Sequence, residues 1–564
     1  MSLPFDTNAE DQKLQMLRER EEEDLAQVLS QKYGLTYQDL SVVPVNVDAL
    51  GLIPEEIART AEVAVFDRNG KHVMLALRNP NNPSLPEVRT SLTDRGYIVE
   101  EFLVSPKSLE RVYSRYIDIS HATSSEAGTF TISESSLSAL SEKLVDVPSF
   151  REHIGALLSS SSAATSRLVE EILVAALAVK ASDVHIEPEE DGVRLRLRLD
   201  GLLTDTYTFD AHTYKSILSR IKLLSGLLLN VTDRAQDGRF TIAVADTDVE
   251  IRTSIIPGGY GETVVLRILN PESIQVTFDQ LGIHPKLLER LKKEIQRPNG
   301  MLLTTGPTGS GKTTSLYTFL RYIQRPDIKI ITIEDPIEYR LPGIVQTQVE
   351  EEYTFESGLR SILRQDPDVI MVGEIRDREV ADTAIQAALT GHFVFSTLHT
   401  NNAAGTFPRL NDLGVDPKSF SSAITVAMAQ RLVRRLDVNK RKQVPLAGEQ
   451  REMVERILST VTDTSLLPPS LDMTWTADRS ENDDPTVGYS GRVGLYEAIF
   501  MDNTLGDFLR DNPSENEIEV EVRRQGFLTM AQDGVLKALA GITSLEEVFK
   551  VVDLPQAETP KENA

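Results

Sequence analysis

The chain has 564 residues, of which 40% are hydrophobic and 26% charged, values typical of a water-soluble protein with several domains. It contains no cysteine, which excludes disulfides, thiol nucleophiles and thiolate metal sites. The formal net charge of -26 argues against a general nucleic-acid binder, because phosphate backbones require an electropositive surface.

The N-terminal part of the sequence predicts a cytoplasmic protein that begins with a tail and a small module. No apolar run approaches the roughly 20 residues that cross a bilayer, and "MSLPFDTNAEDQ" lacks the basic and then apolar pattern of a signal peptide. Residues 1–25 carry the charge run "REREEED", which indicates an acidic tail or a solvated helix. Residues 26–118 combine helical patterns with short strands such as "AEVAVFD" and "HVMLALR", which predicts a separate α/β module.

The middle of the chain predicts a linker and a second domain. Ser/Thr-rich stretches within residues 119–164 favour a mobile linker around one short apolar helix. In residues 165–275, an amphipathic helix precedes "VRLRLRLDG", whose alternating leucines and arginines predict a strand with one apolar and one basic face. The turn "PGGYG" joins two further strands, "DVEIRTSII" and "ETVVLRIL". From residue 276 to residue 437 strands alternate with helices, which predicts a parallel sheet.

A phosphate-binding loop lies in this third region, in "GMLLTTGPTGSGKTTSLYTFL". An apolar strand enters the loop and a helix leaves it, so that backbone N–H groups and the helix N-terminus converge on one anion. The glycines permit a close backbone approach, Lys312 reaches the outer phosphates of ATP, and the Thr313 hydroxyl can ligate Mg²⁺. The predicted nucleotide-binding residues are Gly306, Pro307, Thr308, Gly309, Ser310, Gly311, Lys312, Thr313 and Thr314.

Three carboxylates follow the next apolar strand, in "ITIEDPIEY": Glu334, Asp335 and Glu338. The carboxyl ends of parallel strands meet at one edge of the sheet, so we expect these acids to face Mg-ATP. Hydrolysis needs a carboxylate that orients and deprotonates water, and Glu338 is the candidate base. Any one of these acids alone would more simply be a solvated strand end, and it is their clustering that favours a role.

Two later strand ends carry further candidates. The apolar strand 369–372 in "DPDVIMVGEIRD" leads to Glu374, which we expect to bind magnesium, partly through water. In "TGHFVFSTLHT", His392 and His399 stand at the two ends of one more strand. A lone histidine is more often structural, but His399 lies at the carboxyl end, where it could sense the γ-phosphate.

Four motifs in this order resemble the secretion traffic ATPases of type IV pilus assembly and type II secretion. The phosphate loop "GPTGSGKTT", the aspartate box "TIEDPIEY", the variant Walker B motif "DPDVIMVGEIRD" and the histidine box "TGHFVFSTLHTNNA" all match that family. The likeness extends back through "ASDVHIEPEEDGVRLRLRLDG" and "QDGRF", and forward through "AQRLVRRL" to "GYSGRVGLYEAI". It implies an α/β fold with a RecA-like P-loop core, a preceding PAS-like domain and an N-terminal partner-binding domain of the type II secretion kind.

The resemblance also implies a homo-hexamer in which the second domain delivers arginines to the nucleotide. The matching positions are Arg252 in "EIRTS" and Arg267 in "VVLRIL", with Arg234 and Arg239 next in line. A cation that arrives only on domain closure could couple hydrolysis to movement, although an exposed strand arginine is the simpler interpretation of each position alone. The implied partners are an inner-membrane platform protein and an adaptor, through which the chain would associate with the membrane.

The C-terminal region departs from the family pattern. Many members carry paired C-x-x-C motifs that bind zinc between "RRL" and "GY", whereas this chain has no thiol there. We therefore expect no zinc, and an insertion over residues 438–490 that is either held by packing alone or flexible. Residues 491–553 read as a helical region, and residues 554–564 as a polar tail.

The expected function is a motor ATPase that extends type IV pili. A type II secretion ATPase is the alternative, because partners rather than the ATP site select the substrate. A retraction motor is disfavoured because retraction motors of this family generally lack the first module. A scaffold that does not hydrolyse ATP is disfavoured because Lys312, Thr313, Glu338 and Glu374 are all present.

Overall fold

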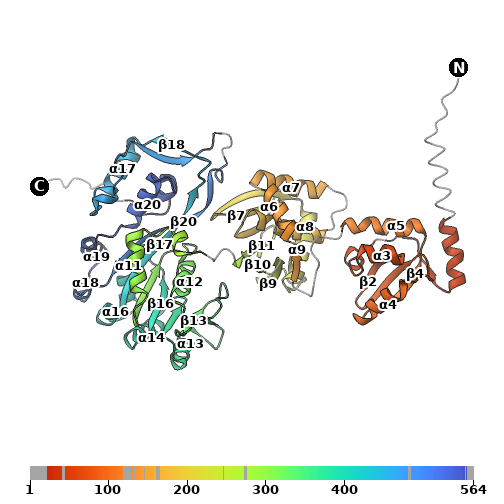
Figure 1. Cartoon of the computed structure of the whole chain (residues 1–564), viewed down its shortest axis with the longest axis horizontal. Coiled ribbons are helices and arrows are strands. Elements are labelled where there is room, and N and C mark those ends of the chain that lie inside the picture. Colours follow the sequence, from red (N-terminus) through yellow and green to blue (C-terminus); the bar gives the residue numbers. More distant parts are fainter. Residues whose placement is uncertain are drawn as a thin grey trace, which may run out of the picture. The chain divides into compact units, whose positions relative to one another are not determined.

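The computed structural model describes residues 22–40, 43, 45–118, 129–132, 134–144, 146–159, 165–244, 247–271, 276–480, 484–552 and 554. Most of the acidic tail and all but one residue of the polar tail lie outside this set, although residues 22–33 are helical. The chain divides into two compact units, one spanning residues 1–197 and 205–268, the other spanning residues 198–204 and 269–564. Each unit is described by itself (Figure 1).

The N-terminal module is a four-stranded sheet in the order β1-β4-β3-β2 with helices packed against it. Strands β2 and β3 are antiparallel, while β4 runs parallel to both of its neighbours. Its strands and helices pack around one apolar core. The elements are β1 (Thr36–Tyr37), α2 (Val47–Leu50), α3 (Glu55–Ala61), β2 (Val63–Asn69), β3 (His72–Leu77), α4 (Leu85–Asp94), β4 (Ile98–Leu103) and α5 (Pro106–Ser114).

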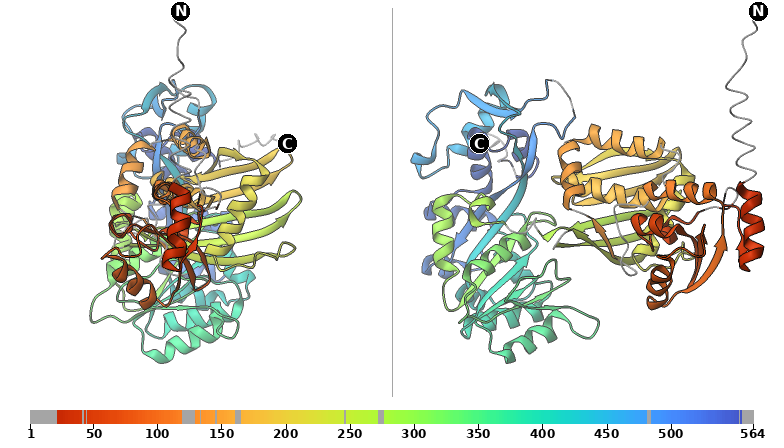
Figure 2. Two further views of the ribbon diagram at one scale, coloured as in Figure 1. Left: turned by 90° about the vertical axis from the view of Figure 1, so that its right-hand side faces the viewer. Right: turned by 45° about the vertical axis from the view of Figure 1, so that its right-hand side comes forward.

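The second domain contains a seven-stranded sheet in the order β5-β9-β10-β11-β6-β7-β8, whose strands form one twisted layer in Figure 2. The alternating stretch is strand β7, in which Val193, Leu195 and Leu197 are buried. The "PGGYG" turn joins β10 to β11 as predicted. The bounds are β6 (Asp183–Glu189), β7 (Gly192–Leu199), β8 (Leu202–Phe209), β9 (Gln236–Val244), β10 (Thr247–Gly258), β11 (Gly261–Leu269), α8 (Thr165–Ala178) and α9 (Ala211–Leu224).

The expected linker over residues 119–164 differs from what the structure describes there. Strand β5 (Thr129–Ile132) adds to the edge of the second domain's sheet by pairing in parallel with β9. Phe130 is buried and stacks on Phe240, with ring centroids 6.1 Å apart. Helices α6 (Glu134–Lys143) and α7 (Val147–Ser159) follow, and Phe150 and Ile154 of α7 are fully buried. Much of the predicted linker is therefore part of the second domain.

The second unit is built on a seven-stranded sheet in the order β14-β13-β15-β16-β12-β17-β20. All neighbours are parallel except β17 and β20. Both faces are covered, because Leu303 of β12 packs into one apolar cluster and Leu302 into the other. The strands are β12 (Gly300–Thr305), β13 (Ile330–Glu334), β14 (Val345–Gln348), β15 (Val369–Val372), β16 (Phe393–Leu398), β17 (Ile424–Leu436) and β20 (Tyr489–Phe500).

Helices cover the two faces of this sheet (Figure 1). They range from the short helix α10 to the longer α12, which begins at the phosphate loop. Their bounds are α10 (Phe278–Leu281), α11 (Pro285–Glu294), α12 (Lys312–Ile323), α13 (Phe355–Ile362), α14 (Arg378–Leu389), α15 (Thr406–Asp412) and α16 (Pro417–Ala423).

In the C-terminal region the structure differs from the predicted helical segment and decides between the two alternatives for the insertion. Residues 491–553 do not form a wholly helical region, because "YSGRVGLYEAIF" is strand β20, paired with β17. The insertion at 438–490 is held by packing over its described residues, with Val454 and Ile457 in the apolar core. The elements are β18 (Arg441–Pro445), α17 (Gly448–Leu458), β19 (Met473–Ala477), α18 (Asn503–Leu509), α19 (Glu515–Val522), α20 (Met530–Leu539) and α21 (Leu545–Phe549).

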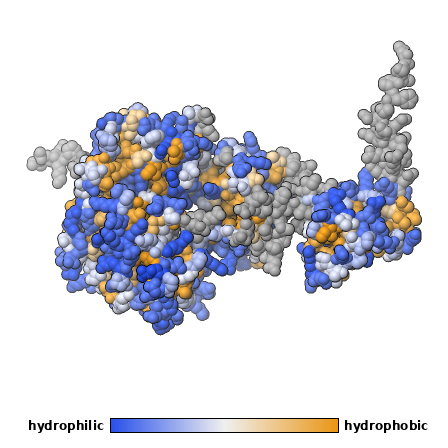
Figure 3. Space-filling model, in the orientation of Figure 1, coloured by the Kyte–Doolittle hydropathy of each residue, from blue (hydrophilic) through white to orange (hydrophobic). Residues whose placement is uncertain are grey.

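The surface of the molecule mixes hydrophilic and hydrophobic residues, as the view in Figure 3 illustrates. Within the part of the chain that the structure describes, no helix is both long and apolar enough to cross a membrane.

Candidate nucleotide site

The phosphate loop occupies the turn between β12 and α12. Strand β12 is buried throughout, and α12 begins at Lys312, directly after Gly311. Gly306, Gly309 and Gly311 have φ angles of 144°, 81° and 88°, in the left-handed region that glycine adopts most easily. A Cβ on Gly306 would lie 2.5 Å from the Gln430 carbonyl oxygen, so a side chain could not fit there. The loop therefore has the compact backbone that a phosphate cradle requires.

Lys312 lies inside this cradle. Its Nζ donates to the carbonyl oxygens of Gly306, at 2.7 Å, and Pro307, at 3.1 Å. Burial lowers the pKa of Lys312 to about 8, although the negative charge of Glu374 opposes that shift and Arg431 adds to it. A phosphate oxygen would offer this ammonium group a charged acceptor in place of the two neutral carbonyls.

Ser310 in the loop and Ser315 in the helix after it differ in their hydrogen bonding. The Ser310 hydroxyl is buried and has no hydrogen-bond partner among the described residues, whereas such a group normally has one. Ser315, one turn into α12, donates to the side-chain oxygen of Gln430 at 2.8 Å. The buried Gln430 thus fastens the helix and the loop to strand β17.

Two of the predicted acidic residues, Glu374 and Asp335, meet at the carboxyl edge of the sheet, because β12, β13, β15 and β16 are all parallel. Glu374 follows β15, and its Oε2 lies 3.5 Å from Nε2 of His399, which follows β16. Arg376 contacts Glu374 and lies 3.5 Å from Oδ2 of Asp335. The structure therefore brings Glu374 together with His399, and the exposed Arg376 bridges Glu374 and Asp335.

Glu334 departs from the expected arrangement. Its buried carboxyl group accepts hydrogen bonds from Tyr317, from Thr332 at 2.6 Å and from Gln346 at 3.2 Å. Burial raises its pKa, partly offset by these three bonds. In this structure the carboxyl group of Glu334 therefore joins β13 to α12 and to β14.

Glu338, the predicted general base, is half-buried in the segment between β13 and β14.

The two arginines that are predicted to reach the nucleotide lie in the second domain. Arg252 on β10 pairs with Glu250, its Nε lying 3.1 Å from Oε1, and Arg267 on the neighbouring β11 pairs with Asp183 at 3.2 Å. Arg239 on β9 is directly opposite Arg252. These arginines belong to the first unit and the phosphate loop to the second, so their catalytic role stays a prediction.

The sequence interpretation missed three residues around the loop. Arg376 stands inside the quoted "GEIRD", Gln430 in "AQRLVRRL" and Glu497 in "GLYEAI". A polar residue within an otherwise apolar strand was the signal available for Gln430 and Glu497, but their partners lie about 100 residues away in the chain. Sequence spacing alone does not reveal such contacts.

Two protein families match the chain. The family described as "Type II/IV secretion system protein" matches residues 159–550, more than half of the chain. The chain belongs to this family. It is accordingly an ATPase of the secretion family, with the P-loop described above. The "MshEN domain" family matches residues 33–123, which cover most of the N-terminal module.

Individual relatives of this secretion ATPase are named for type II secretion or for type IV pilus assembly. Type II secretion system protein E of Xanthomonas campestris is 41% identical over 70% of this chain and 68% of its own length. The type IV pilus assembly ATPase PilB of Myxococcus xanthus is 34% identical over 94% of this chain and 91% of its own length. The crystal structure of the pilus retraction motor PilT with bound ADP is 27% identical, covers 68% of this chain and 97% of that chain, and has a TM-score of 0.46.

Among the described residues, no cluster of three or more histidine, aspartate or glutamate side chains could hold a metal ion. A magnesium ion that arrives with ATP takes most of its ligands from phosphates and water. The Thr313 hydroxyl and Glu374 would supply the protein's share. When bound, the ion would neutralise charge on the phosphates.

Proposed function

We propose that the chain is a hexameric, cytoplasmic motor that extends type IV pili by acting on an inner-membrane platform protein, with the help of an adaptor. The proposal is supported by the match to PilB of Myxococcus xanthus, which spans 94% of the chain and so includes the N-terminal module. Type II secretion proteins match over as much as 91% of the chain, so the extent of the match does not separate the two functions. A type II secretion ATPase is the alternative, and a retraction motor or a non-hydrolysing scaffold is disfavoured.

In the proposed reaction, residues of the second unit hold and hydrolyse the nucleotide. The phosphate loop and Lys312 bind the phosphates, Thr313 and Glu374 hold magnesium, and Glu338 takes a proton from the attacking water. His399 senses the γ-phosphate, and its contact with Glu374 would link that sensing to the metal. The geometry that supports this assignment is the meeting of Glu374 and His399 at the edge of the sheet that carries the phosphate loop.

Arg252 and Arg267 complete the proposed cycle. Each would approach the γ-phosphate when the second domain closes over a nucleotide, stabilising transition-state charge. Release of phosphate would remove that attraction, and the resulting movement would be passed to the platform protein. The net charge of -26 gives no reason to add a nucleic-acid partner.

The test replaces Lys312 in the chromosomal gene of the source bacterium. Lys312→Ala removes the point charge from the phosphate cradle, so ATP turnover by the purified protein should fall to background. Surface pili should disappear from the cells, whereas secretion of folded exoproteins should continue. Lys293→Ala, at an exposed lysine on α11 that pairs with Glu289, is the matched control. Lost secretion with intact pili would instead assign the chain to type II secretion.

A further inference from the structure

Glu497 on strand β20 holds two backbone segments with one carboxylate. Its Oε1 accepts the N–H of Ala403 at 2.7 Å, and its Oε2 accepts the N–H of Met530 at 2.9 Å. Both segments are well packed, because Ala403 is 1% exposed and Met530 is 6% exposed. No role in the reaction described above uses this carboxylate.

The first segment is the loop over residues 399–403, which follows β16 and starts with His399. Thr400 donates its N–H to the Thr305 hydroxyl at 2.7 Å, and Thr305 directly precedes the phosphate loop. Arg431 donates to the carbonyl oxygen of Asn401 at 2.8 Å. The loop therefore lies against the start of the phosphate cradle, and Glu497 holds its far end.

The second segment is the N-terminus of helix α20. Met530 is the first helical residue, so its N–H has no acceptor inside the helix and a negative charge nearby is favourable. Helix α20 packs against α21. A displacement of α20 would thus reach the C-terminal helices.

The environment of Glu497 keeps its carboxylate tied to both segments. Burial raises its pKa, while the two N–H groups and the charge of Arg431 oppose that shift. Gln430 and Tyr496, the cross-strand pair next to Ala429 and Glu497, contact Ser315 of α12. Strands β17 and β20 thus contact the phosphate-loop helix through Gln430 and Tyr496, and the loop over 399–403 through Arg431 and Glu497.

We propose that Glu497 is a positioning residue that sets the loop over 399–403 against the phosphate cradle and couples the nucleotide state to helix α20. This role rests on the proposed function of His399 as the γ-phosphate sensor. A carboxylate that only capped α20 would stabilise the fold without affecting the response of that helix to nucleotide. The two roles therefore differ in what they predict for one conservative variant.

The variant is Glu497→Gln in the full-length chain. Glutamine has the same shape, but its amide nitrogen must face one of the two N–H donors, so one hydrogen bond is lost. The turnover number should fall roughly tenfold with an unchanged KM for ATP, the size expected for one charge-assisted hydrogen bond lost in the transition state. Hydrogen exchange of peptides over 399–405 and 527–533 should differ between ATP-analogue and ADP complexes of the wild type, and this difference should vanish in the variant.

The matched control is Glu547→Gln, which weakens the buried ion pair of Glu547 with Arg434 in the same unit but leaves the loop over 399–403 intact. It should lower stability and keep wild-type turnover well below its melting temperature. A Glu497→Gln protein with wild-type turnover and wild-type exchange differences would overturn the proposal, as would equal loss of turnover in the control. If Glu497→Gln fails to fold, the test is made on the wild type alone. Hydrogen exchange of the Ala403 and Met530 amides must then slow together when the ATP analogue binds. If the exchange rates of the two amides change independently, the coupling is overturned. A wild type without any ATP turnover would instead refute the proposed function.

Discussion

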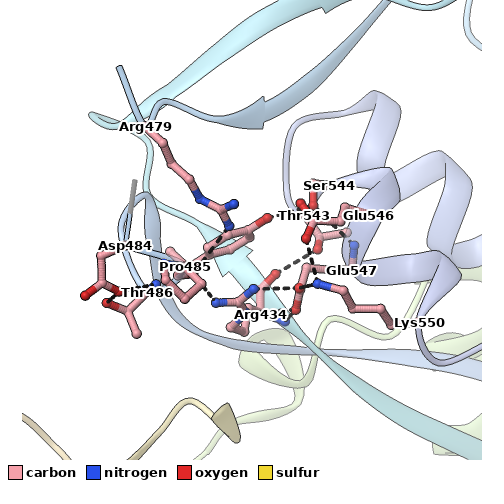
Figure 4. Close-up of polar contacts among 11 residues, drawn as sticks. Arg434, Arg479, Asp484, Pro485, Thr486, Thr543, Ser544, Glu546, Glu547 and Lys550 are labelled. Atoms are coloured by element: carbon pink, nitrogen blue, oxygen red, sulfur yellow. Dashed lines mark hydrogen bonds and ion pairs between the residues drawn. The ribbon is translucent and has the colours of Figure 1, made fainter. Parts of the chain in front are cut away.

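Arg434 on β17 and Glu547 on α21 form a two-pronged ion pair inside the C-terminal region (Figure 4). Nε lies 2.9 Å from Oε2 and Nη2 lies 2.7 Å from Oε1, with the side chains 8% and 9% exposed. The guanidinium also stacks on the ring of Tyr489, 4.1 Å from its centroid, and donates to the carbonyl oxygen of Pro485 at 2.6 Å. Arg479 reaches the same ring and the same carbonyl. The pair thus joins the core sheet, the last helix and the end of the insertion at 438–490 without any thiol.

Glu547→Gln tests how much this pair stabilises the insertion. The substitution leaves a buried arginine without a counter-charge, and breaking a buried pair in this way costs about 3 kcal/mol. Trp475, the single tryptophan of the chain, lies in β19 of the insertion and stacks with Arg441, so its fluorescence reports unfolding there. The urea midpoint followed by Trp475 should fall. Glu546→Gln, which removes an exposed neighbour on the same helix, is the control and should change the midpoint little. Equal midpoints for wild type and Glu547→Gln would mean that the pair adds no net stability.

The same pair makes a prediction about pH. Burial alone would raise the pKa of Glu547, but the hydrogen bond and charge of Arg434, with a smaller effect of Lys550, lower it to about 2. An unfolded glutamate has a pKa of about 4.3, so between these values the unfolded chain binds more protons than the folded one. The stability from this group is complete above the unfolded pKa and is lost as the pH falls from about 4.3 toward about 2. Wild type should therefore lose its stability advantage over Glu547→Gln on acidification through that range. A constant difference between the two urea midpoints would contradict the assignment.

Local patterns in the sequence predicted the centre of the second unit. The strand before the phosphate loop, the helix after it and the buried strand 369–372 each stand in a continuous run of residues, and the structure confirms all three. Strand β5 could not be found in this way, because four residues within a Ser/Thr-rich stretch are held by distant pairing with β9. For the same reason the sequence predicts a helical region where the structure has β20, since only its pairing with β17 identifies it as a strand.

The candidate nucleotide site likewise contains contacts that local sequence patterns do not reveal. Glu374 and His399 follow two neighbouring parallel strands, and the rule that such strands end at one edge of the sheet accounts for their contact. The commitment of Glu334 to Tyr317 depends instead on how α12 packs against β13, and no spacing in the sequence reports a contact between them.

Glu338→Gln separates chemistry from binding. The amide keeps the size and hydrogen-bonding reach of the side chain but lacks a basic carboxylate, so ATP should bind nearly as in the wild type. Hydrolysis should fall by roughly 100-fold or more, the scale of losing a general base. Single-turnover hydrolysis and binding of a fluorescent ATP analogue measure the two effects. Glu352→Gln, at an exposed acid in a nearby loop, is the control and should behave as wild type. Parallel loss of binding and hydrolysis would make Glu338 a structural or metal-shell residue instead.

Arg252→Ala and Arg267→Ala test whether the second domain supplies the closing cations. In the described structure their guanidinium groups contact carboxylates of their own domain, Glu250 and Asp183, and such pairs could be exchanged for a γ-phosphate on closure. Each arginine would then favour the closed state only when the third phosphate is present, which is the requirement for a ligand to shift a two-state equilibrium. Turnover should therefore fall strongly in both variants, and affinity for ADP should stay almost unchanged.

The decisive quantity is the ratio of ATP-analogue affinity to ADP affinity, compared between the wild type and each arginine variant. Arg196→Ala is the matched control, because Arg196 lies on β7 of the same sheet, is paired with Glu187 and Asp205, and is 24% exposed against 25% for Arg252. Its ratio and turnover should equal those of the wild type. An unaltered ratio and unaltered turnover in Arg252→Ala and Arg267→Ala would make both ordinary strand residues. Arg239 would then be tested next, because it lies directly opposite Arg252 and would reach a closing nucleotide from the same face of the sheet.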